Sequence, residues 1–149
     1  MKFIIATDHR GKEIKEKVID ILKNEFEIID CSKENFDTDD YPDFAFKACS
    51  TLINQNIDFA VLICGTGIGM SIAANKIKGI RCALINTKED ACLAKKHNNA
   101  NVLAFSANKD VNKIVECINE FAISEFEGGK HERRINKISL IENGDYDEL

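Results

Sequence analysis

The sequence has no long hydrophobic segment. Its N-terminal apolar run, from Phe3 to Ala6, is too short for the core of a signal peptide or for a membrane span. Positive charge is not in excess either, since the formal net charge of the 149 residues is −5. This balance argues against a general nucleic-acid binder, although a small anionic ligand responds to local charge. We therefore predict a cytoplasmic protein that binds neither membranes nor nucleic acid.

The chain also lacks the cysteine patterns of a metal site or of a disulfide framework. Its six cysteines contain no CxxC pair, and the intervals between them do not match zinc spacing. Most of them lie in apolar periodic segments, as buried reduced thiols do. The residues that we expect to be small core residues are Cys31, Cys49, Cys82, Cys92 and Cys117, whereas Cys64 lies in a motif of its own.

Apolar and polar residues alternate along the chain in a way that indicates an α/β fold. Apolar residues make up 44% of the sequence and charged residues 30%, which suits one globular domain over residues 1–149. Short apolar segments alternate with amphipathic ones, and this is typical of a five-stranded parallel sheet between two layers of helices. The expected class is a Rossmann-like three-layer α/β/α sandwich. The predicted strands are residues 2–6, 27–31, 59–64, 81–85 and 102–105.

Amphipathic patterns predict a helix after each strand. In the first helix Ile14, Val18, Ile21 and Leu22 form the apolar face, and the lysines and glutamates lie opposite. Later helices are expected from Tyr41, over residues 68–76, after the N-cap Thr87 to about residue 96, and over residues 111–122. A last amphipathic helix follows the glycines at 128–129, and we expect it to pack on a partner subunit. The acidic tail, residues 143–149, is expected to fray.

The segment Cys64-Gly65-Thr66-Gly67-Ile68-Gly69 has the clearest chemical pattern. A buried strand leads into it and a helix follows, so its backbone amides can converge on an anion. Cys64 ends the strand beside this loop. A thiol has a reference pKa near 8.5, and a helix N-terminus or a cation lowers it. The pattern therefore favours a cysteine that acts as nucleophile or base next to an anion site.

Other interpretations of the glycine loop fit less well. A dinucleotide-binding loop would have a third glycine where Met70 stands and an acid after the next strand, which ends in Ile85-Asn86. A Walker loop would continue with G-K-[ST], and a cysteine phosphatase would end its C-x5-R loop in an arginine, where Met70 and Ser71 stand. A plain structural turn with an inert buried thiol is the alternative without chemistry.

Several polar residues are expected near the same edge of the sheet, because ligands of open parallel sheets bind beyond the carboxyl ends of the strands. Asp8-His9 follows the first strand, Tyr41 lies on the connection after the second, and residues 106–109 follow the fifth. His97-Asn98 falls in a predicted loop at the opposite edge. It can reach the site only through a long loop or from a neighbouring subunit.

A basic cluster near the C-terminus suits a phosphorylated ligand. The ordered motifs together make the chain similar to the type B ribose-5-phosphate isomerases, in a family that also contains galactose-6-phosphate isomerase subunits. The resemblance runs from residue 2 to about residue 142. The segments that carry it are Asp8-His9, Asp40-Tyr41-Pro42, residues 64–76, Gly79-Ile80-Arg81, His97-Asn98, residues 101–105, Glu127-Gly128-Gly129, His131 and Arg134.

This resemblance implies an aldose–ketose isomerase without metal or organic cofactor. Cys64 would move a proton between C1 and C2 of the sugar with help from Thr66, and the loop amides would hold the enediolate oxygen. His97 would be the acid that opens the furanose ring. The site would be shared across a homodimer or a tetramer. The implied substrate-binding residues are Asp8, His9, Tyr41, Gly65, Gly67, Ile68, Gly69, Asn98, Asn108, Lys130 and Arg134.

Three departures from the family pattern stand in this sequence. Lys130 replaces a usual arginine and loses its bidentate fork. Asn108 or Lys109 stands where a further phosphate-binding arginine often occurs. Ala73-Ala74-Asn75 offers no glutamate base, so this is a cysteine-type site. We expect isomerisation of ribose 5-phosphate to ribulose 5-phosphate through a cis-enediolate. The alternatives are a 6-phosphohexose substrate, such as allose or galactose 6-phosphate, and a nucleotide-binding α/β domain that is not an enzyme.

Overall fold

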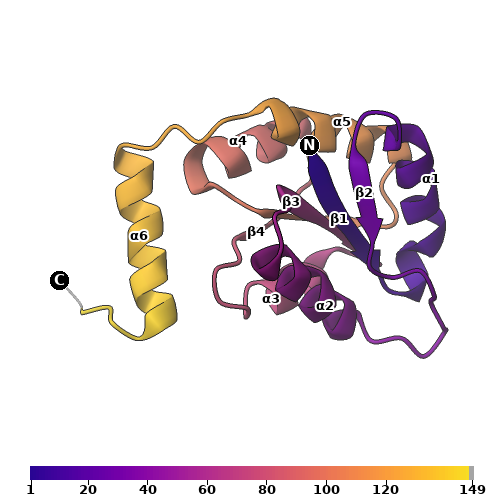
Figure 1. The fold of residues 1–149 in the computed structure, drawn as a ribbon, viewed down its shortest axis with the longest axis horizontal. Helices are drawn as coiled ribbons and strands as arrows, with labels where there is room; N and C mark the ends of the chain where they lie inside the picture. Colours follow the sequence, from indigo (N-terminus) through magenta and orange to yellow (C-terminus); the bar gives the residue numbers. More distant parts are fainter. Residues whose placement is uncertain (148–149) are drawn as a thin grey trace.

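A parallel sheet of five strands forms the centre of the molecule (Figure 1). The structure is a computed structural model, and it describes residues 1–147. The strand order is β2-β1-β3-β5-β4, and every neighbouring pair is parallel. The strands are β1 (Lys2–Thr7), β2 (Glu27–Asp30), β3 (Phe59–Cys64), β4 (Cys82–Leu84) and β5 (Val102–Ser106).

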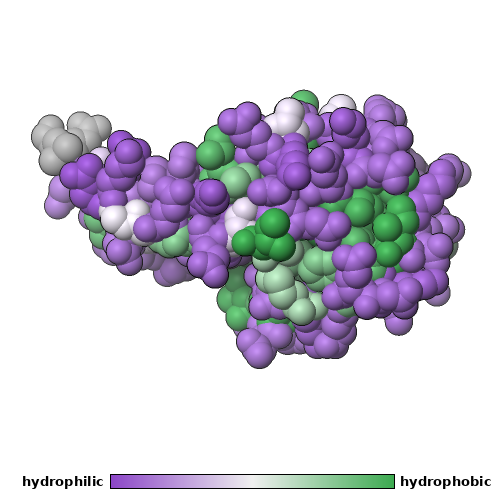
Figure 2. All heavy atoms as spheres, turned by 90° about the horizontal axis from the view of Figure 1, so that it is seen from above, coloured by the Kyte–Doolittle hydropathy of each residue, from purple (hydrophilic) through white to green (hydrophobic). Residues whose placement is uncertain are grey.

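Helices cover both faces of this sheet, which confirms the three-layer prediction. Successive residues of β3 alternate between two buried clusters, so each face of the strand has its own core. One cluster lies against α1 (Lys12–Leu22), α4 (Lys88–Asn98) and α5 (Val111–Ile123), and the other lies against α2 (Tyr41–Asn54) and α3 (Ile68–Ala74). β3 is buried over its whole length because both faces are covered. The outer side of the α4 and α5 layer is mostly hydrophilic (Figure 2).

Several helix predictions needed correction, and the helix predicted over residues 68–76 ends at Ala74. α4 continues through His97 and Asn98, which the sequence placed in a loop. The capping box of Thr87 and Asp90 begins this helix as predicted, and the helix ends only at Asn99, which takes a left-handed conformation with φ 44°. In α1 the buried residues are Lys15, Val18 and Leu22, whereas Ile21 is 43% exposed. The buried face of α1 is therefore turned toward Lys15, because a cation there has partners within the fold.

Lys15 is the centre of a buried polar network that joins α1 to the ends of β1 and β2. Its ammonium group lies 3.0 Å from Asp30 and donates at 2.6 Å to the carbonyl of Ser32. The hydroxyl of Ser32 in turn accepts the backbone N–H of Thr7 at 2.9 Å. Asn35 donates to the carbonyl of the same Thr7 at 2.9 Å. These contacts hold the residue that immediately precedes Asp8.

The last helix, α6 (Lys130–Asn143), stands apart from the layered domain (Figure 1). None of its residues is buried, and Ile138 and Ile141 are 45% and 60% exposed. Glu142 accepts the backbone N–H of Gly79 at 2.9 Å and ties the helix to the connection between α3 and β4. Asn143, which the sequence assigned to the tail, is the last residue of the helix, and Gly144 caps it. The tail residues 148–149 lie outside the described part of the chain.

No helix within residues 1–147 combines the length and the apolar character that crossing a bilayer requires. All six cysteines are free, as the sequence predicted. Burial raises the pKa of the Cys31, Cys82 and Cys117 thiols, and it raises that of Cys49 to about 12. These four thiols are therefore protonated and inert at neutral pH. Cys31, Cys49 and Cys117 are buried as predicted, whereas Cys82 and Cys92, also expected in the core, are only partly buried.

The buried network predicts a large effect of the substitution Lys15→Met. Methionine keeps the apolar stem but leaves Asp30 and the Ser32 carbonyl without their cation. We expect the free energy of unfolding in urea to fall by about 3 kcal/mol, which is typical when one partner of a buried ion pair is removed. Lys17→Met is the matched control, because Lys17 pairs with Glu13 on the exposed side of the same helix and should matter little. Equal unfolding midpoints for the two variants would contradict this assignment.

Candidate active site at the switch point of the sheet

The sheet changes its direction of growth between β1 and β3. The chain goes from β1 outward to β2, and then returns to place β3 on the other side of β1. Ligands of open parallel sheets bind at such a switch point, beyond the carboxyl ends of the strands. Thr7 pairs with Ile63 in register, so Asp8 and Cys64 follow neighbouring positions of the two strands. The structure thus places both predicted residues at this edge.

The loop after β3 is fitted closely against β5. Gly67 has φ 78°, and a Cβ atom built on it would lie 2.8 Å from the backbone carbonyl carbon of Phe105. Only glycine combines this left-handed conformation with so close a main-chain approach. The backbone N–H of Ala107 donates to the carbonyl of Cys64 at 2.8 Å, and Ser106 donates to that of Gly65 at 2.8 Å. The loop is consequently held on the β5 side by main-chain and side-chain contacts.

Two side chains lie on the other glycines of the loop. A Cβ atom on Gly69 would lie 2.7 Å from the ring of Tyr41, so this ring rests on the first turn of α3. A Cβ atom on Gly65 would lie 3.1 Å from Cδ of Arg10 and 3.5 Å from its Nη1. Tyr41 was predicted to be at the site, whereas Arg10 was not. The signal for Arg10 was its place in the loop Asp8-His9-Arg10-Gly11 after β1, which sequence reasoning used only for its first two residues.

Cys64 is the last residue of β3, and its side chain belongs to the face that α2 and α3 cover. It is 4% exposed. The sequence predicted a sulfur that faces the loop, and the strand end does lie beside Gly65. The thiol itself packs in the buried cluster under α2 and α3, next to the loop.

The residues after β1 are held in a tight turn. Asp8 is 5% exposed, and its carboxylate accepts the backbone N–H of Arg10 at 3.0 Å. His9 begins the short 3-10 helix η1 (His9–Gly11), and its Nδ1 atom is buried without a hydrogen-bond partner within residues 1–147. The hydroxyl of Thr66 accepts the N–H of Ile68 at 3.3 Å, so its own proton is free for another acceptor.

The loop after β5 separates Asn108 from Lys109. The amide of Asn108 lies at the glycine loop, 3.4 Å from the carbonyl of Gly65. Lys109 instead donates to the carbonyl of Asn86 at 2.8 Å, at the end of β4. Of the two residues that could replace the missing arginine, Asn108 is the one beside the loop.

The remaining predicted residues lie at the other end of the sheet, near the amino ends of its strands. His97 and Asn98 end α4, where Arg81, just before β4, donates to the carbonyls of Asn98 and Asn99 at 3.1 and 2.9 Å. Lys130 and Arg134 lie on the first turns of α6. The described chain by itself does not bring these four residues to Cys64. The sequence indicated this for His97 and Asn98, whereas the basic residues Lys130 and Arg134 were expected near the pocket at the end of β3, and in one chain they are not there.

His97 lies beside the third histidine of the sequence. The imidazoles of His97 and His131 are stacked, with ring centroids 4.2 Å apart. Burial and the neighbouring His97 and Lys130 lower the pKa of His131, although Glu127 acts in the opposite direction. His131 is therefore mostly neutral at pH 7.

These features define a Rossmann-like α/β protein whose candidate ligand site, at a switch point of the sheet, has an amide-rich loop next to a thiol. The family model described as ribose/galactose isomerase matches residues 3–138. The chain belongs to the ribose/galactose isomerase family.

Individual relatives agree with this assignment. A probable ribose-5-phosphate isomerase B of Mycoplasma genitalium is 42% identical over 142 residues, which cover 93% of each chain. The structure of ribose-5-phosphate isomerase B from Clostridium thermocellum is similar with a TM-score of 0.92 and 36% identity, over 98% of this chain and 100% of that one. The Mycoplasma genitalium enzyme with bound ribulose 5-phosphate has a TM-score of 0.88 and 39% identity, over 95% and 96% of the chains.

The contact of Gly67 with β5 predicts that Gly67→Ala disrupts the loop. Gly79→Ala is a matched control, since Gly79 has φ 84° and open space around the position of a Cβ atom. Both variants bear a left-handed strain of about 1–2 kcal/mol, and Gly67→Ala adds a clash with main chain that cannot rotate away. We expect urea unfolding to show a loss at least about 2 kcal/mol larger for Gly67→Ala. Equal losses would mean that the loop has room to shift.

Proposed function

We propose that this protein is a ribose-5-phosphate isomerase that interconverts ribose 5-phosphate and ribulose 5-phosphate through a cis-enediolate in the cytoplasm. The family assignment and the relatives named ribose-5-phosphate isomerase B support the reaction. The bound ribulose 5-phosphate of the Mycoplasma genitalium structure supports a phosphorylated pentose as substrate. The observation that carries the proposal is the single strand-end thiol, Cys64, beside the Gly65–Gly69 loop.

In this mechanism Cys64, as a thiolate, removes the proton from C2 of the open-chain aldose and returns it to C1, while the proton of the C2 hydroxyl passes to the C1 oxygen. Negative charge that develops on the carbonyl oxygen is stabilised by backbone N–H groups of the loop. A rigid donor set contributes most when it is already oriented before the reaction, and the contacts of Gly65 and Gly67 with β5 provide that rigidity. Thr66 has a hydroxyl proton to donate to the sulfur or to a sugar oxygen.

The substrate phosphate requires cations. Some of them come from the amino-end side of the sheet and one from the carboxyl-end side. Lys130 and Arg134 project from α6 and serve as the principal ligands of the phosphate. Arg10 adds a guanidinium group at Gly65, in a chain that lacks the arginine often found after β5. Asn108 lies at the same carbonyl and contributes a neutral donor.

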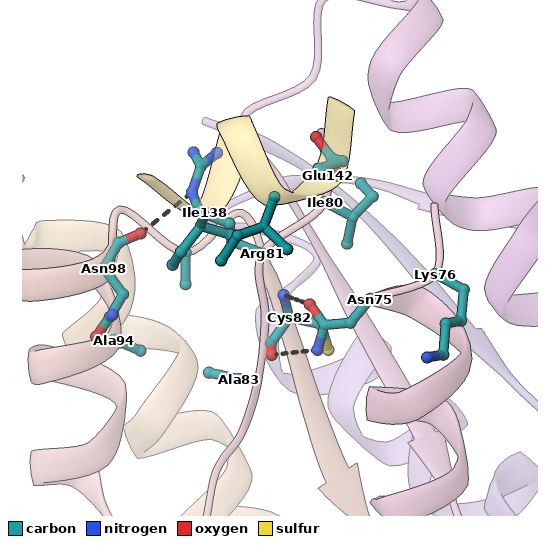
Figure 3. A pocket seen from close by; sticks show the side chains of 12 residues that line it. Asn75, Lys76, Ile80, Arg81, Cys82, Ala83, Ala94, Asn98, Ile138 and Glu142 are labelled. Carbon is teal, nitrogen blue, oxygen red and sulfur yellow. Dashed lines mark hydrogen bonds between the residues drawn. The ribbon is translucent and has the colours of Figure 1, made fainter. Parts of the chain in front are cut away.

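A complete site then requires two chains. The Cys64 edge and the His97 edge lie at opposite ends of the parallel strands, so a homodimer joins the Cys64 of one chain with the His97, Asn98, Lys130 and Arg134 of its partner. The exposed apolar residues of α6 support such an interface, as do Ile68 and Ile72 on α3, which are 51% and 56% exposed. A groove of about 570 Å³ runs between α6 and the start of β4, with Ile138 opposite Ile80 and Arg81 (Figure 3).

The role of the sulfur is tested by Cys64→Ala. We expect kcat for ribose 5-phosphate to fall by a factor of at least about 1,000, because the variant retains no base on β3, while calorimetry still detects substrate binding. Cys49→Ala is the matched control, since this thiol lies in the same cluster under α2 and should lower stability but not kcat. Full turnover by Cys64→Ala would remove the sulfur from the mechanism.

The shared site is tested by mixing two inactive variants, Cys64→Ala and His97→Asn. In a mixed dimer, one site contains both substitutions and the other contains neither. Random exchange of subunits should therefore restore about a quarter of the wild-type activity. Cys64→Ala mixed with itself after the same unfolding and refolding is the control. Mixtures that stay inactive, although mass spectrometry shows mixed dimers, would place both residues in one chain.

A further inference from the structure

Three side chains, from α4, from the connection before α6 and from α6 itself, converge at the start of α6. His97 ends α4, Glu127 lies on the connection to α6, and His131 lies in the first turn of α6. Glu127 Oε2 is 3.8 Å from Nε2 of His97 and 3.7 Å from Nε2 of His131. Both distances are too long for hydrogen bonds. The carboxylate therefore lies between two imidazole nitrogens without being bonded to either.

The ligand atoms of the three residues all lie within 4.8 Å of one another. Two histidines and one glutamate form a donor set that zinc uses in proteins, with water in the fourth position. A tetrahedral ion with bonds of about 2.0 Å would need its ligand atoms about 3.3 Å apart, so the two distances from the Glu127 carboxylate must each shorten by roughly half an ångström. The stacked rings, whose planes differ by 7°, must also tilt toward the ion. The side chains of His97 and Glu127, which are 40% and 50% exposed, have room for that movement.

Backbone hydrogen bonds hold two of the three ligands in place before any ion binds. The N–H of Glu127 donates to the carbonyl of Lys96 at 3.0 Å, which fixes the connection to the residue next to His97. The N–H of His131 donates to the carbonyl of Gly128 at 3.0 Å, and Arg81 caps the end of α4. The side chain of His131 is only 12% exposed. Two of the three ligands are thus anchored by hydrogen bonds of the backbone that carries them.

We propose that His97, Glu127 and His131 form a binding site for a zinc-type divalent cation, which inhibits the enzyme when it is occupied. A metal on Nε2 of His97 takes the lone pair with which the imidazole would exchange a proton. The inhibitory part of this inference rests on the proposed role of His97 in ring opening. The binding part rests only on the geometry of the three ligands. The two parts therefore fail separately.

Calorimetric titration of the intact protein with ZnCl2 tests the binding part. We expect one ion per chain, and we expect His131→Gln and Glu127→Gln each to weaken binding at least about tenfold. His9→Gln is the matched control, because it removes the remaining histidine of the chain and should leave zinc binding unchanged. Unchanged affinity in both His131→Gln and Glu127→Gln would overturn the site.

Cobalt substitution distinguishes this site from one made by the cysteines. Co²⁺ at His97, Glu127 and His131 should give weak visible bands that His131→Gln abolishes. A strong thiolate-to-cobalt charge-transfer band that persists in His131→Gln would show that cysteines bind the metal and would overturn the assignment.

The inhibitory part is tested by activity. Zinc should lower kcat of the wild type with ribose 5-phosphate, and His131→Gln should need at least about tenfold more zinc for the same inhibition. Zinc binding without inhibition would overturn only the regulatory consequence. A wild-type protein that binds zinc but shows no isomerase activity would count against the proposed function and leave the metal site standing.

Discussion

The close approach of Gly67 to the main chain of Phe105 is the constraint on which the candidate site depends. It allows the loop after β3 to rest on β5, and the hydrogen bonds from Ala107 and Ser106 then fix the carbonyls of Cys64 and Gly65. A side chain at position 67 would push the loop away from the sheet. The amides would then lose the fixed orientation that a developing oxyanion requires. Because it has no side chain, Gly67 allows both the packing of the loop on β5 and the fixed orientation of the loop amides.

A second constraint is the buried polar network around Lys15, which positions the end of β1. The buried ammonium group of Lys15 connects α1, β2 and the segment after β2 to Thr7, the residue before Asp8. β2 ends at Asp30, so it offers no ladder partner to the last residues of β1, and the side chains of Ser32 and Asn35 satisfy the backbone of Thr7 instead. The segment after β1, which contains Asp8, is therefore positioned by polar contacts. The glycine loop after β3 is positioned by main-chain packing on β5.

The sequence was sufficient to predict the layered architecture and to identify the residues that follow each strand. Periodicity and glycine spacing are local signals that can be read without the fold. The sequence was not sufficient for Lys15, which amphipathic reasoning assigned to the polar face although its charge is satisfied inside. It also missed Arg10, whose contact with Gly65 arises from the pairing of β1 with β3. The length of α4 was underestimated because the left-handed turn at Asn99 gives no stronger sequence signal than the neighbouring Asn98 and Asn101. Which residues take part in catalysis is a question that the proposed experiments answer.

The order of the strands has a consequence for how the protein is made. In the finished sheet β5 lies between β3 and β4, although β4 comes first in the chain. While the polypeptide is being synthesised, β4 leaves the ribosome before its only neighbour exists, and the inner edge of β3 is open for the same period. A nascent chain that ends before residue 102 can assemble β2, β1 and β3 alone. The contacts that fix the glycine loop must therefore wait for β5, so the candidate site is completed late in synthesis.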